Sequence, residues 1–279
     1  MNKSIQSILV IITGFFLLYP IFFVVSGSLM NPAEMMEYLK PLMNNSSEYV
    51  RWSFLPQRPT LSSWIEVLMD TPEFFVMFWN SIKVSVLTCI LQLFIAVPTA
   101  WKMAVYKYKG QKIVYCLYIM LALTPFSILM LPQYMVLQSF GLIDTLYVLI
   151  LPGVFSTFPI LIIHSFMKKI PSALIEMART EGASEVYIFF HVGLPLIKEG
   201  IILSILYSFV EQWSLFEQPL LFLKTESYWT LPIYLTNIEL EQSHLAFSAS
   251  VFTMILPILL LGIAKDKLEN GISDIFLKE

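Results

Sequence analysis

Six long apolar runs constrain the fold of this chain more than any other feature. They cover approximately Ile5–Leu29, Ile82–Ala104, Ile113–Tyr134, Leu146–Phe166, Ile201–Leu223 and Leu245–Ala264. A helix needs about 20 apolar residues to cross a bilayer, and a helix satisfies its own backbone hydrogen bonds inside lipid. The runs therefore predict an all-α polytopic membrane protein with six transmembrane helices in a single domain over residues 1–279.

The composition agrees with a membrane protein. Hydrophobic residues make up 57% of the chain and charged residues only 13%, whereas charged residues are about 25% of a soluble domain. The first apolar run is too long for a signal peptide, and no small-x-small cleavage site follows it, so we expect it to remain as a span. The two cysteines and three scattered histidines indicate neither a disulfide framework nor a metal site.

The distribution of basic residues predicts the orientation, because cytoplasmic loops of membrane proteins are enriched in lysine and arginine. Lysines follow the second and the last apolar runs, and four basic residues lie in or beside the central polar segment; Lys3 precedes the first run. We therefore expect both termini in the cytoplasm and a long outer loop over residues 30–80. Within this loop, residues 60–69 predict a helix with Ser62 or Ser63 as its N-cap.

The segment Ile170–Glu199 is the longest polar stretch between the central runs, and Gly182 divides it into two amphipathic pieces. Glycine adopts positive φ at little cost, so it permits a sharp turn between two helices. The pattern predicts a helix, a tight turn and a second helix that lie outside the lipid and present a surface to another molecule. An ordinary cytoplasmic loop is the alternative interpretation.

The same segment resembles the EAA loop of the permease subunits of ABC importers. The resemblance rests on Glu176–Ala183, which reads EMARTEGA, and on the later pair Leu194-Pro195. Further stretches resemble the maltose-type sugar permeases, among them Asn80-Ser81 before the second span and YWTLP at residues 228–232. The chain departs from the family in its fifth run, where the asparagine-aspartate pair after Trp213 is absent.

The resemblance implies a type I ABC-importer permease fold and a set of partners. These are a second, related permease subunit, two ATPase subunits, an external solute-binding protein and the lipid bilayer of the cell membrane, without nucleic acid. It also implies that the central loop couples to the ATPase through eight residues: Leu174, Glu176, Ala178, Glu181, Gly182, Ala183, Leu194 and Pro195. The cargo implied is a sugar or oligosaccharide.

The chain itself contains no phosphate-binding P-loop of the form GxxxxGK[ST]. We therefore expect no enzymatic activity and no cofactor of its own, with ATP and magnesium bound by the partner ATPase subunits.

The fifth apolar run has an unusual polar content. Charged groups inside a span are costly, so they usually face a protein interior or a water-filled cavity. The candidate residues for the translocation path are Glu211, Gln212, Trp213, Ser214 and Glu217. Hydrogen bonding between helices inside the bundle is the alternative explanation for them.

Two other classes of function remain open. A stand-alone proton- or ion-coupled carrier would use Glu211 and Glu217 as proton sites, although six spans without a visible internal repeat are few for such a carrier. A scaffold protein of the membrane would not transport at all, and that class does not explain the predicted helix pair around Gly182. Kinks are expected at Pro125, in the third run, and in the fourth run at Pro152 and Pro159.

Overall fold

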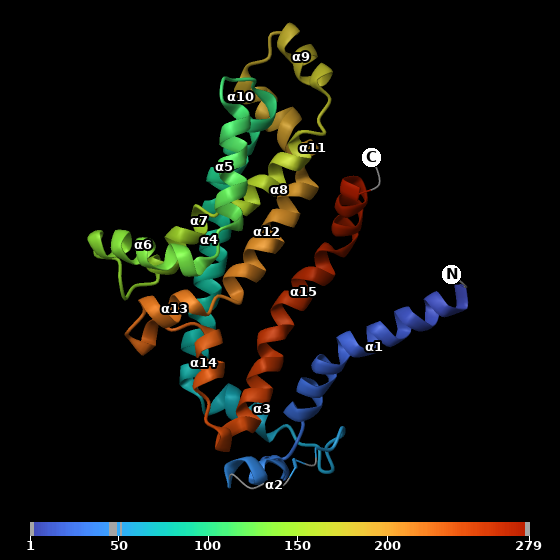
Figure 1. The fold of residues 1–279 in the computed structure, drawn as a ribbon, viewed down its shortest axis with the longest axis vertical. Coiled ribbons are helices and arrows are strands. Elements are labelled where there is room, and N and C mark those ends of the chain that lie inside the picture. Colours follow the sequence, from blue (N-terminus) through green and yellow to red (C-terminus); the bar gives the residue numbers. More distant parts are fainter. Residues whose placement is uncertain (1–2, 45–48, 51, 277–279) are drawn as a thin grey trace. The chain divides into compact units, whose positions relative to one another are not determined.

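A computed structural model describes residues 3–44, 49–50 and 52–276, and the side chains of residues 7–44, 49–50 and 52–265. Every regular element in these ranges is helical, as predicted (Figure 1). The stretch of residues 44–47, whose composition is typical of a turn, and the tail after residue 265 lie largely outside the described side chains.

Four stretches are long and apolar enough to cross a membrane as they stand. They are Ser7–Ser28 in α1 (Lys3–Ser28), all of α4 (Pro72–Val105), Tyr147–Met167 formed by α7 (Tyr147–Val154) and α8 (Phe158–Met167), and Leu240–Lys265, most of it in α15 (Ser243–Phe276). Two bent pairs complete the set within the described residues: α5 (Gln111–Leu123) with α6 (Phe126–Ser139), and Glu185–Leu196 with α12 (Lys198–Trp213). The structure thus has up to six spans, as the apolar runs predict.

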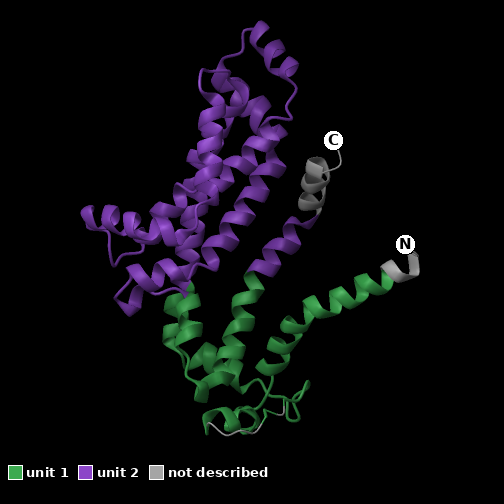
Figure 2. Cartoon of the chain, viewed as in Figure 1, with its two compact units in different colours: residues 1–78, 231–256 green, residues 79–230, 257–279 purple. Residues whose placement is uncertain are grey.

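The chain divides into two compact units (Figure 2). Unit 1 comprises residues 1–78 and 231–256, with α1, α2 (Pro32–Met43), α3 (Ser62–Met69), α14 (Leu231–Asn237) and the first parts of α4 and α15. Met30, Met35 and Leu39 form a small core there, on which Trp52 and Phe247 pack. The predicted helix at residues 60–69 is present as α3, but the predicted cap is wrong: Leu61 holds the N-cap position without a side-chain bond, and Ser62 is the first helical residue.

Unit 2 comprises residues 79–230 and 257–279. One core joins α4, α8 and the central segment through buried residues that include Trp101, Ile163, Ile175, Ile188 and Ile197. A second core joins α4, α6, α7 and α13 (Glu217–Phe222), and the fully buried Phe222 is its largest member. The short helices α9 (Ser172–Thr180), α10 (Glu185–Ile188) and α11 (Leu194–Leu196) form the central segment, with a π-helical turn at Phe189–Gly193.

The third span is broken where its proline predicted a kink. α5 and α6 meet at 98°, and Thr124 between them is extended, with φ −73° and ψ 119°. A residue that precedes proline is sterically pushed out of the helical region, so Pro125 sets the position of the break.

The prediction of one helix over Ile201–Leu223 is wrong. α12 ends at Trp213, and α13 starts only at Glu217. Ser214 caps the end: its backbone N–H and its hydroxyl both donate to the carbonyl of Val210, at 3.1 and 2.7 Å. Serine side chains compete in this way for helical carbonyls, and hydropathy does not register the effect.

Candidate functional site

The turn at Gly182 ends α9 with a full Schellman motif. Gly182 has φ +86°, its N–H donates to the carbonyl of Arg179 at 3.0 Å, and the N–H of Ala183 donates to the carbonyl of Ala178 at 3.0 Å. These two bonds satisfy carbonyls at the helix end that would otherwise lack partners. The turn is therefore closed by the backbone itself, at the position where the sequence predicts it.

The second helix of the segment begins directly after the turn. Ser184 is its N-cap, and its hydroxyl accepts the N–H of Tyr187 at 3.2 Å. A serine cap of this kind stabilises a helix start by about 1 kcal/mol. Only Gly182 and Ala183 therefore separate the C-cap Glu181 from the N-cap Ser184, which leaves little freedom between α9 and α10.

A polar cluster ties both helices to the end of α4. Arg179 donates to both carboxylate oxygens of Glu185, at 2.6 and 3.1 Å, and the hydroxyl of Tyr106 donates to Glu185 Oε2 at 2.5 Å. Arg179 and Lys102 also lie over the ring of Tyr106, at 5.7 and 4.1 Å from its centroid. Glu185 of α10 thus links this helix to α9 and to the chain directly after α4.

These bonds shift the pKa values of the cluster. The hydrogen bonds from Arg179 and Tyr106 lower the pKa of Glu185, while the bond to Glu185 raises the pKa of Arg179. The pKa of Tyr106 is raised, mainly because its hydroxyl donates a hydrogen bond to the Glu185 carboxylate. All three shifts favour the charge states that hold the cluster together at neutral pH.

The segment has one anchored side and one free side. Ile175, Ile188 and Ile197 are buried in the unit 2 core, and Ala178 and Ala183 pack against it. Six large apolar side chains of the segment are exposed: Leu174, Met177, Val186, Tyr187, Phe190 and Leu196. Apolar side chains that gather on one exposed surface mark contact sites for other molecules.

The predicted coupling residues divide between these two sides. Leu174, Glu176, Glu181, Gly182 and Pro195 are exposed, whereas Ala178, Ala183 and Leu194 are half-buried against the core. The structure brings all eight into one segment of unit 2. Sequence reasoning missed Glu185 and Tyr106; the signal for Glu185 was an acid in the first turn after a serine cap.

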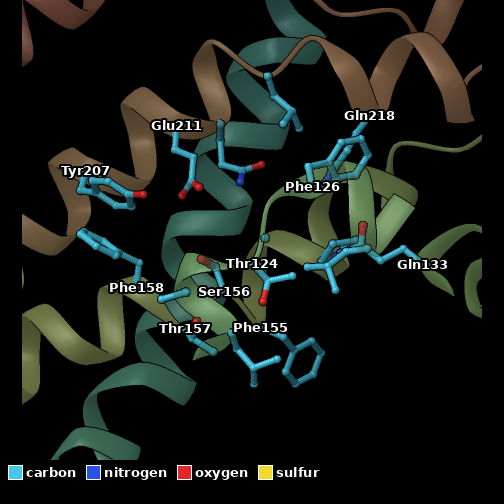
Figure 3. A pocket seen from close by; sticks show the side chains of 17 residues that line it. Thr124, Phe126, Gln133, Phe155, Ser156, Thr157, Phe158, Tyr207, Glu211 and Gln218 are labelled. Atoms are coloured by element: carbon cyan, nitrogen blue, oxygen red, sulfur yellow. The ribbon is translucent and has the colours of Figure 1, made fainter. Parts of the chain in front are cut away.

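The second candidate site is a cavity of about 300 Å³ inside unit 2 (Figure 3). The ends of α5 and α12, the starts of α6 and α8, and residues of α7 and α13 line it. Its polar lining comes from Thr124, Gln133, Ser156, Glu211, Gln212 and Gln218. The Tyr207 hydroxyl points toward the Glu211 carboxylate, and Phe158 stacks on Tyr207 with ring centroids 4.4 Å apart (Figure 3).

The structure separates the five residues that the sequence assigns to a translocation path. Glu211 and Gln212 line the cavity. Trp213 is buried and stacks on Phe209, while Ser214 and Glu217 are exposed and do not line it. Successive side chains of a helix point about 100° apart, so Glu211, Gln212 and Trp213 face different directions, and the break at Ser214 places Glu217 in the next helix.

Gln212 also belongs to a tight crossing of helices. The backbone at Gly153 of α7 lies very close to α4 and α12. A Cβ at this position would lie 2.6 Å from Thr88 Cγ2 and 2.8 Å from Gln212 Nε2. Gln92 donates to the Gly153 carbonyl at 2.8 Å and accepts from the Ser208 hydroxyl at 2.5 Å. Small residues and interhelical hydrogen bonds are typical of helix packing in membranes, so part of the polar content of α12 serves the bundle itself.

Comparison with known proteins assigns the chain to a family. Residues 74–274 match the family described as the binding-protein-dependent transport system inner membrane component. The chain belongs to this family. It is accordingly a multi-pass membrane protein, and the central segment and the cavity both lie within the matched residues.

Individual relatives and a solved structure agree with this assignment. The chain is 27% identical to the arabinooligosaccharides transport system permease protein AraQ of Bacillus subtilis, over 88% of this chain and 84% of that protein. It is 26% identical to the sulfoquinovosyl glycerol transport system permease protein SmoH of Agrobacterium fabrum, over 92% and 87%. Its fold resembles a chain in the crystal structure of a bacterial ABC transporter involved in the import of the acidic polysaccharide alginate, with TM-score 0.77, 19% identity and coverage of 95% and 98%.

Proposed function

We propose that this chain is one permease subunit of an ATP-binding-cassette importer for a sugar or oligosaccharide. An external binding protein delivers the cargo, and separate ATPase subunits supply the energy. In the proposed assembly the chain pairs with a second, related permease and docks two copies of the ATPase, on which ATP and magnesium bind. The names of the relatives support a carbohydrate cargo.

The observation that carries the proposal is the construction of the central segment. α9 and α10 are capped at the turn, pinned to α4 through Glu185, and anchored by buried isoleucines, yet they keep an exposed apolar surface. A rigid helix pair with an unpaired apolar surface is suited to transmit a push from a docked partner, because it does not deform when loaded. In the proposal this surface docks on the ATPase, with Leu174, Glu176 and Glu181 at the contact.

Transport then follows from two states of the bundle. Closure of the ATPase pair on ATP moves the docked helices, and the broken spans around the cavity reorient so that access alternates between the two sides. ATP drives this cycle only through its different affinity for the two states. The break at Thr124 and the break at Ile197 are the positions at which we expect the spans to bend.

Uptake into right-side-out vesicles that are loaded with ATP tests the proposal. With the whole transporter and its binding protein present, labelled oligosaccharide should accumulate only with ATP on the ATPase side, and a proton gradient alone should not replace ATP. Accumulation driven by a proton gradient without ATP would instead favour a stand-alone carrier. Co-purification in mild detergent should recover a Walker-motif ATPase and a second permease.

Gly182→Trp separates coupling from folding. Gly182 is exposed, and no atom lies within 4 Å of the position that a Cβ would take there, so the indole has room and should obstruct a docked partner. The positive φ costs any side chain there about 1–2 kcal/mol. Gly141→Trp is the matched control, because Gly141 also has positive φ, at +68°, and open space around it. We expect the Gly182 variant to insert and to lose uptake more than tenfold, while the Gly141 variant keeps most of it.

A further inference from the structure

We propose that the cavity of unit 2 is a sugar subsite that takes an uncharged, hydroxyl-rich ring and rejects acidic sugars. This inference rests on the proposed function, since it concerns the cargo of the same importer. The names of similar proteins leave the charge of the cargo open, because they include arabinooligosaccharides, the sulfonated sulfoquinovosyl glycerol and the acidic alginate. The charge of the cargo therefore has to be inferred from the residues that line the cavity.

Its first relevant property is a set of oxygen acceptors without partners. Gln133 Oε1, Glu211 Oε2 and Gln212 Oε1 are buried, and none has a hydrogen-bond partner in the described part of the chain. The Thr124 hydroxyl donates to the carbonyl of Met120 at 2.8 Å, so toward the cavity it acts as an acceptor. A ligand satisfies these atoms with O–H or N–H donors, and an unsatisfied buried acceptor is costly.

The second property is a supply of donors from the backbone. α6 begins at Phe126 and α8 at Phe158, and both residues line the cavity. The first turn of a helix has free N–H groups and carries roughly half a positive charge. Both helix starts border the cavity, so backbone donors lie near its oxygen acceptors, although Pro159 contributes none. Hydroxyl groups, which donate and accept at once, suit such a lining.

The aromatic side chains and the size of the cavity suit a ring. Phe126 and Phe158 lie on different sides of the space in Figure 3, with Tyr207 stacked on Phe158. The apolar C–H face of a sugar ring packs on such aromatic faces while its hydroxyls reach the polar atoms. A volume of about 300 Å³ lies at the lower end of ligand pockets, roughly 300–1,000 Å³, which favours a single ring at a time.

The third property argues against acidic sugars. Among the 17 described residues that line the cavity, Glu211 is the only acid, and lysine, arginine and histidine do not occur among them. Proteins bind carboxylates and sulfonates through such cations. A uronate here would place its carboxylate close to the Glu211 carboxyl without a cation to pair with, and burial of an unpaired charge is strongly unfavourable.

Protection of an introduced thiol measures binding directly and does not depend on delivery by the binding protein. Ser156→Cys lies on the cavity wall and is made with Cys89→Ala and Cys116→Ser, which remove the two native thiols. The complete transporter in nanodiscs is treated with methyl methanethiosulfonate, with or without millimolar sugar. The probes are a neutral panel (arabinotriose, maltotriose, raffinose) and an acidic panel (trigalacturonate, a mannuronate trimer).

We expect at least one neutral trisaccharide to slow modification of the Ser156→Cys thiol at least threefold, and the acidic trisaccharides to leave the rate unchanged. Equal or better protection by an acidic trisaccharide overturns the proposal, and so does the absence of protection by either panel. Gln138→Cys is the control thiol, because Gln138 lies on the same helix as Gln133 but is exposed and outside the cavity. Protection there would reveal an effect unrelated to the cavity and would also count against the proposal.

Two substitutions test the named contacts. Gln133→Leu removes an acceptor that has no partner in the described part of the chain, so it should weaken protection by neutral sugar, while Gln138→Leu should not. Glu211→Lys places a cation at the cavity and should allow acidic trisaccharides to protect the thiol. If the sugars still protect the thiol in the same order, Glu211 does not set the selectivity. If Glu211→Lys prevents insertion into the membrane, Glu211→Gln is used instead. It should reduce the ratio of protection by neutral trisaccharides to protection by acidic ones.

Uptake by the same transporter, reconstituted in proteoliposomes, distinguishes failure of the subsite from failure of the proposed function. ATP-dependent uptake without protection at Ser156→Cys would leave the proposed function standing and refute the subsite. Loss of ATP dependence in the parent transporter would refute the proposed function itself, whatever the thiol shows.

Discussion

Asp144 and Thr225 are 81 positions apart in the chain and are joined by two hydrogen bonds to the Asp144 carboxylate. Thr225 donates its N–H at 2.8 Å and its hydroxyl at 2.6 Å, and the N–H of Lys224 adds a third bond at 2.7 Å. Asp144 itself has φ 63°, and its own N–H donates to the carbonyl of Phe222 at 3.1 Å. One residue thus ties the turn after α6 to the chain that follows α13.

Asp144→Ala should lower the thermal unfolding temperature of the detergent-solubilised chain by several degrees. The change removes three hydrogen bonds and places a side chain at positive φ that tolerates it less well than Asp or Asn does. Asp144→Asn keeps one acceptor oxygen and the conformational tolerance, so its effect should be less than half as large. Equal effects of the two substitutions would show that the carboxylate bonds contribute little.

The same contact predicts a dependence on pH. Hydrogen bonds from Thr225 and Lys224 lower the pKa of Asp144 from its ordinary value of 3.8. A carboxyl whose folded pKa is depressed contributes stability that is complete above the unfolded pKa and is lost as pH falls through the folded value. The difference in unfolding temperature between the parent and Asp144→Asn should therefore be constant near neutral pH and shrink below about pH 4. A difference that grows on acidification would contradict this sign.

Glu185→Ala and Tyr106→Phe should not be additive, because both remove the hydrogen bond that joins these side chains. The effect on stability should be small, about 1 kcal/mol or less, since the cluster is exposed and surface ion pairs are weak. The larger effect is expected on uptake, as α9 and α10 lose their tie to α4. Glu185→Ala combined with Tyr187→Phe is the control cycle, in which additive changes are expected.

Gly182→Ala should destabilise the chain by about 1–2 kcal/mol, the cost of a left-handed conformation for a residue with a Cβ. The surrounding space is open, so the effect is one of backbone conformation alone. Gly182→Asn should cost less, because asparagine tolerates this region. Gly262→Ala, also with open space but within a helix and without positive φ, should be neutral or stabilising. A neutral Gly182→Ala would contradict the role of the Schellman turn.

Gly153→Ala should destabilise the bundle by about 1–3 kcal/mol through overpacking. The new methyl group would overlap Thr88 Cγ2 and Gln212 Nε2. Thr88→Ser removes only the first of these atoms and should rescue part of the loss in the double variant. Thermal unfolding followed by size-exclusion fluorescence measures all three proteins, and a double variant no more stable than Gly153→Ala alone would place the clash elsewhere.

Local rules that act within a few residues were readable from the sequence. Pro125 predicted the break of the third span, and Gly182 predicted the turn in the central segment. Proline restricts the backbone conformation of the residue before it, and glycine widens the range of its own. The residue type alone therefore predicts the local structure in both cases.

Features that depend on which side-chain bonds form, or on contacts between distant residues, were not readable. The end of α12 at Trp213 was missed because hydropathy counts Ser214 as one polar residue and does not register its bond to Val210. The role of Glu185 depends on Tyr106, 79 positions away. Gln133 and Thr124 join Glu211 at the cavity only because α5 and α6 bend sharply, a geometry that no local pattern specifies.

The joint at Ile197 has a mechanical consequence. The helical stretch Glu185–Leu196 meets α12 there at 73°, and α12 continues without interruption to Trp213, so Glu211 lies about 20 Å along its axis from the joint. At this radius, a tilt of about 10° displaces the Glu211 end by about 3.5 Å, which exceeds the length of a hydroxyl hydrogen bond, about 2.7–2.8 Å. In the proposed transport cycle, a small change of angle at this joint would therefore be enough to exchange the polar contacts around Glu211.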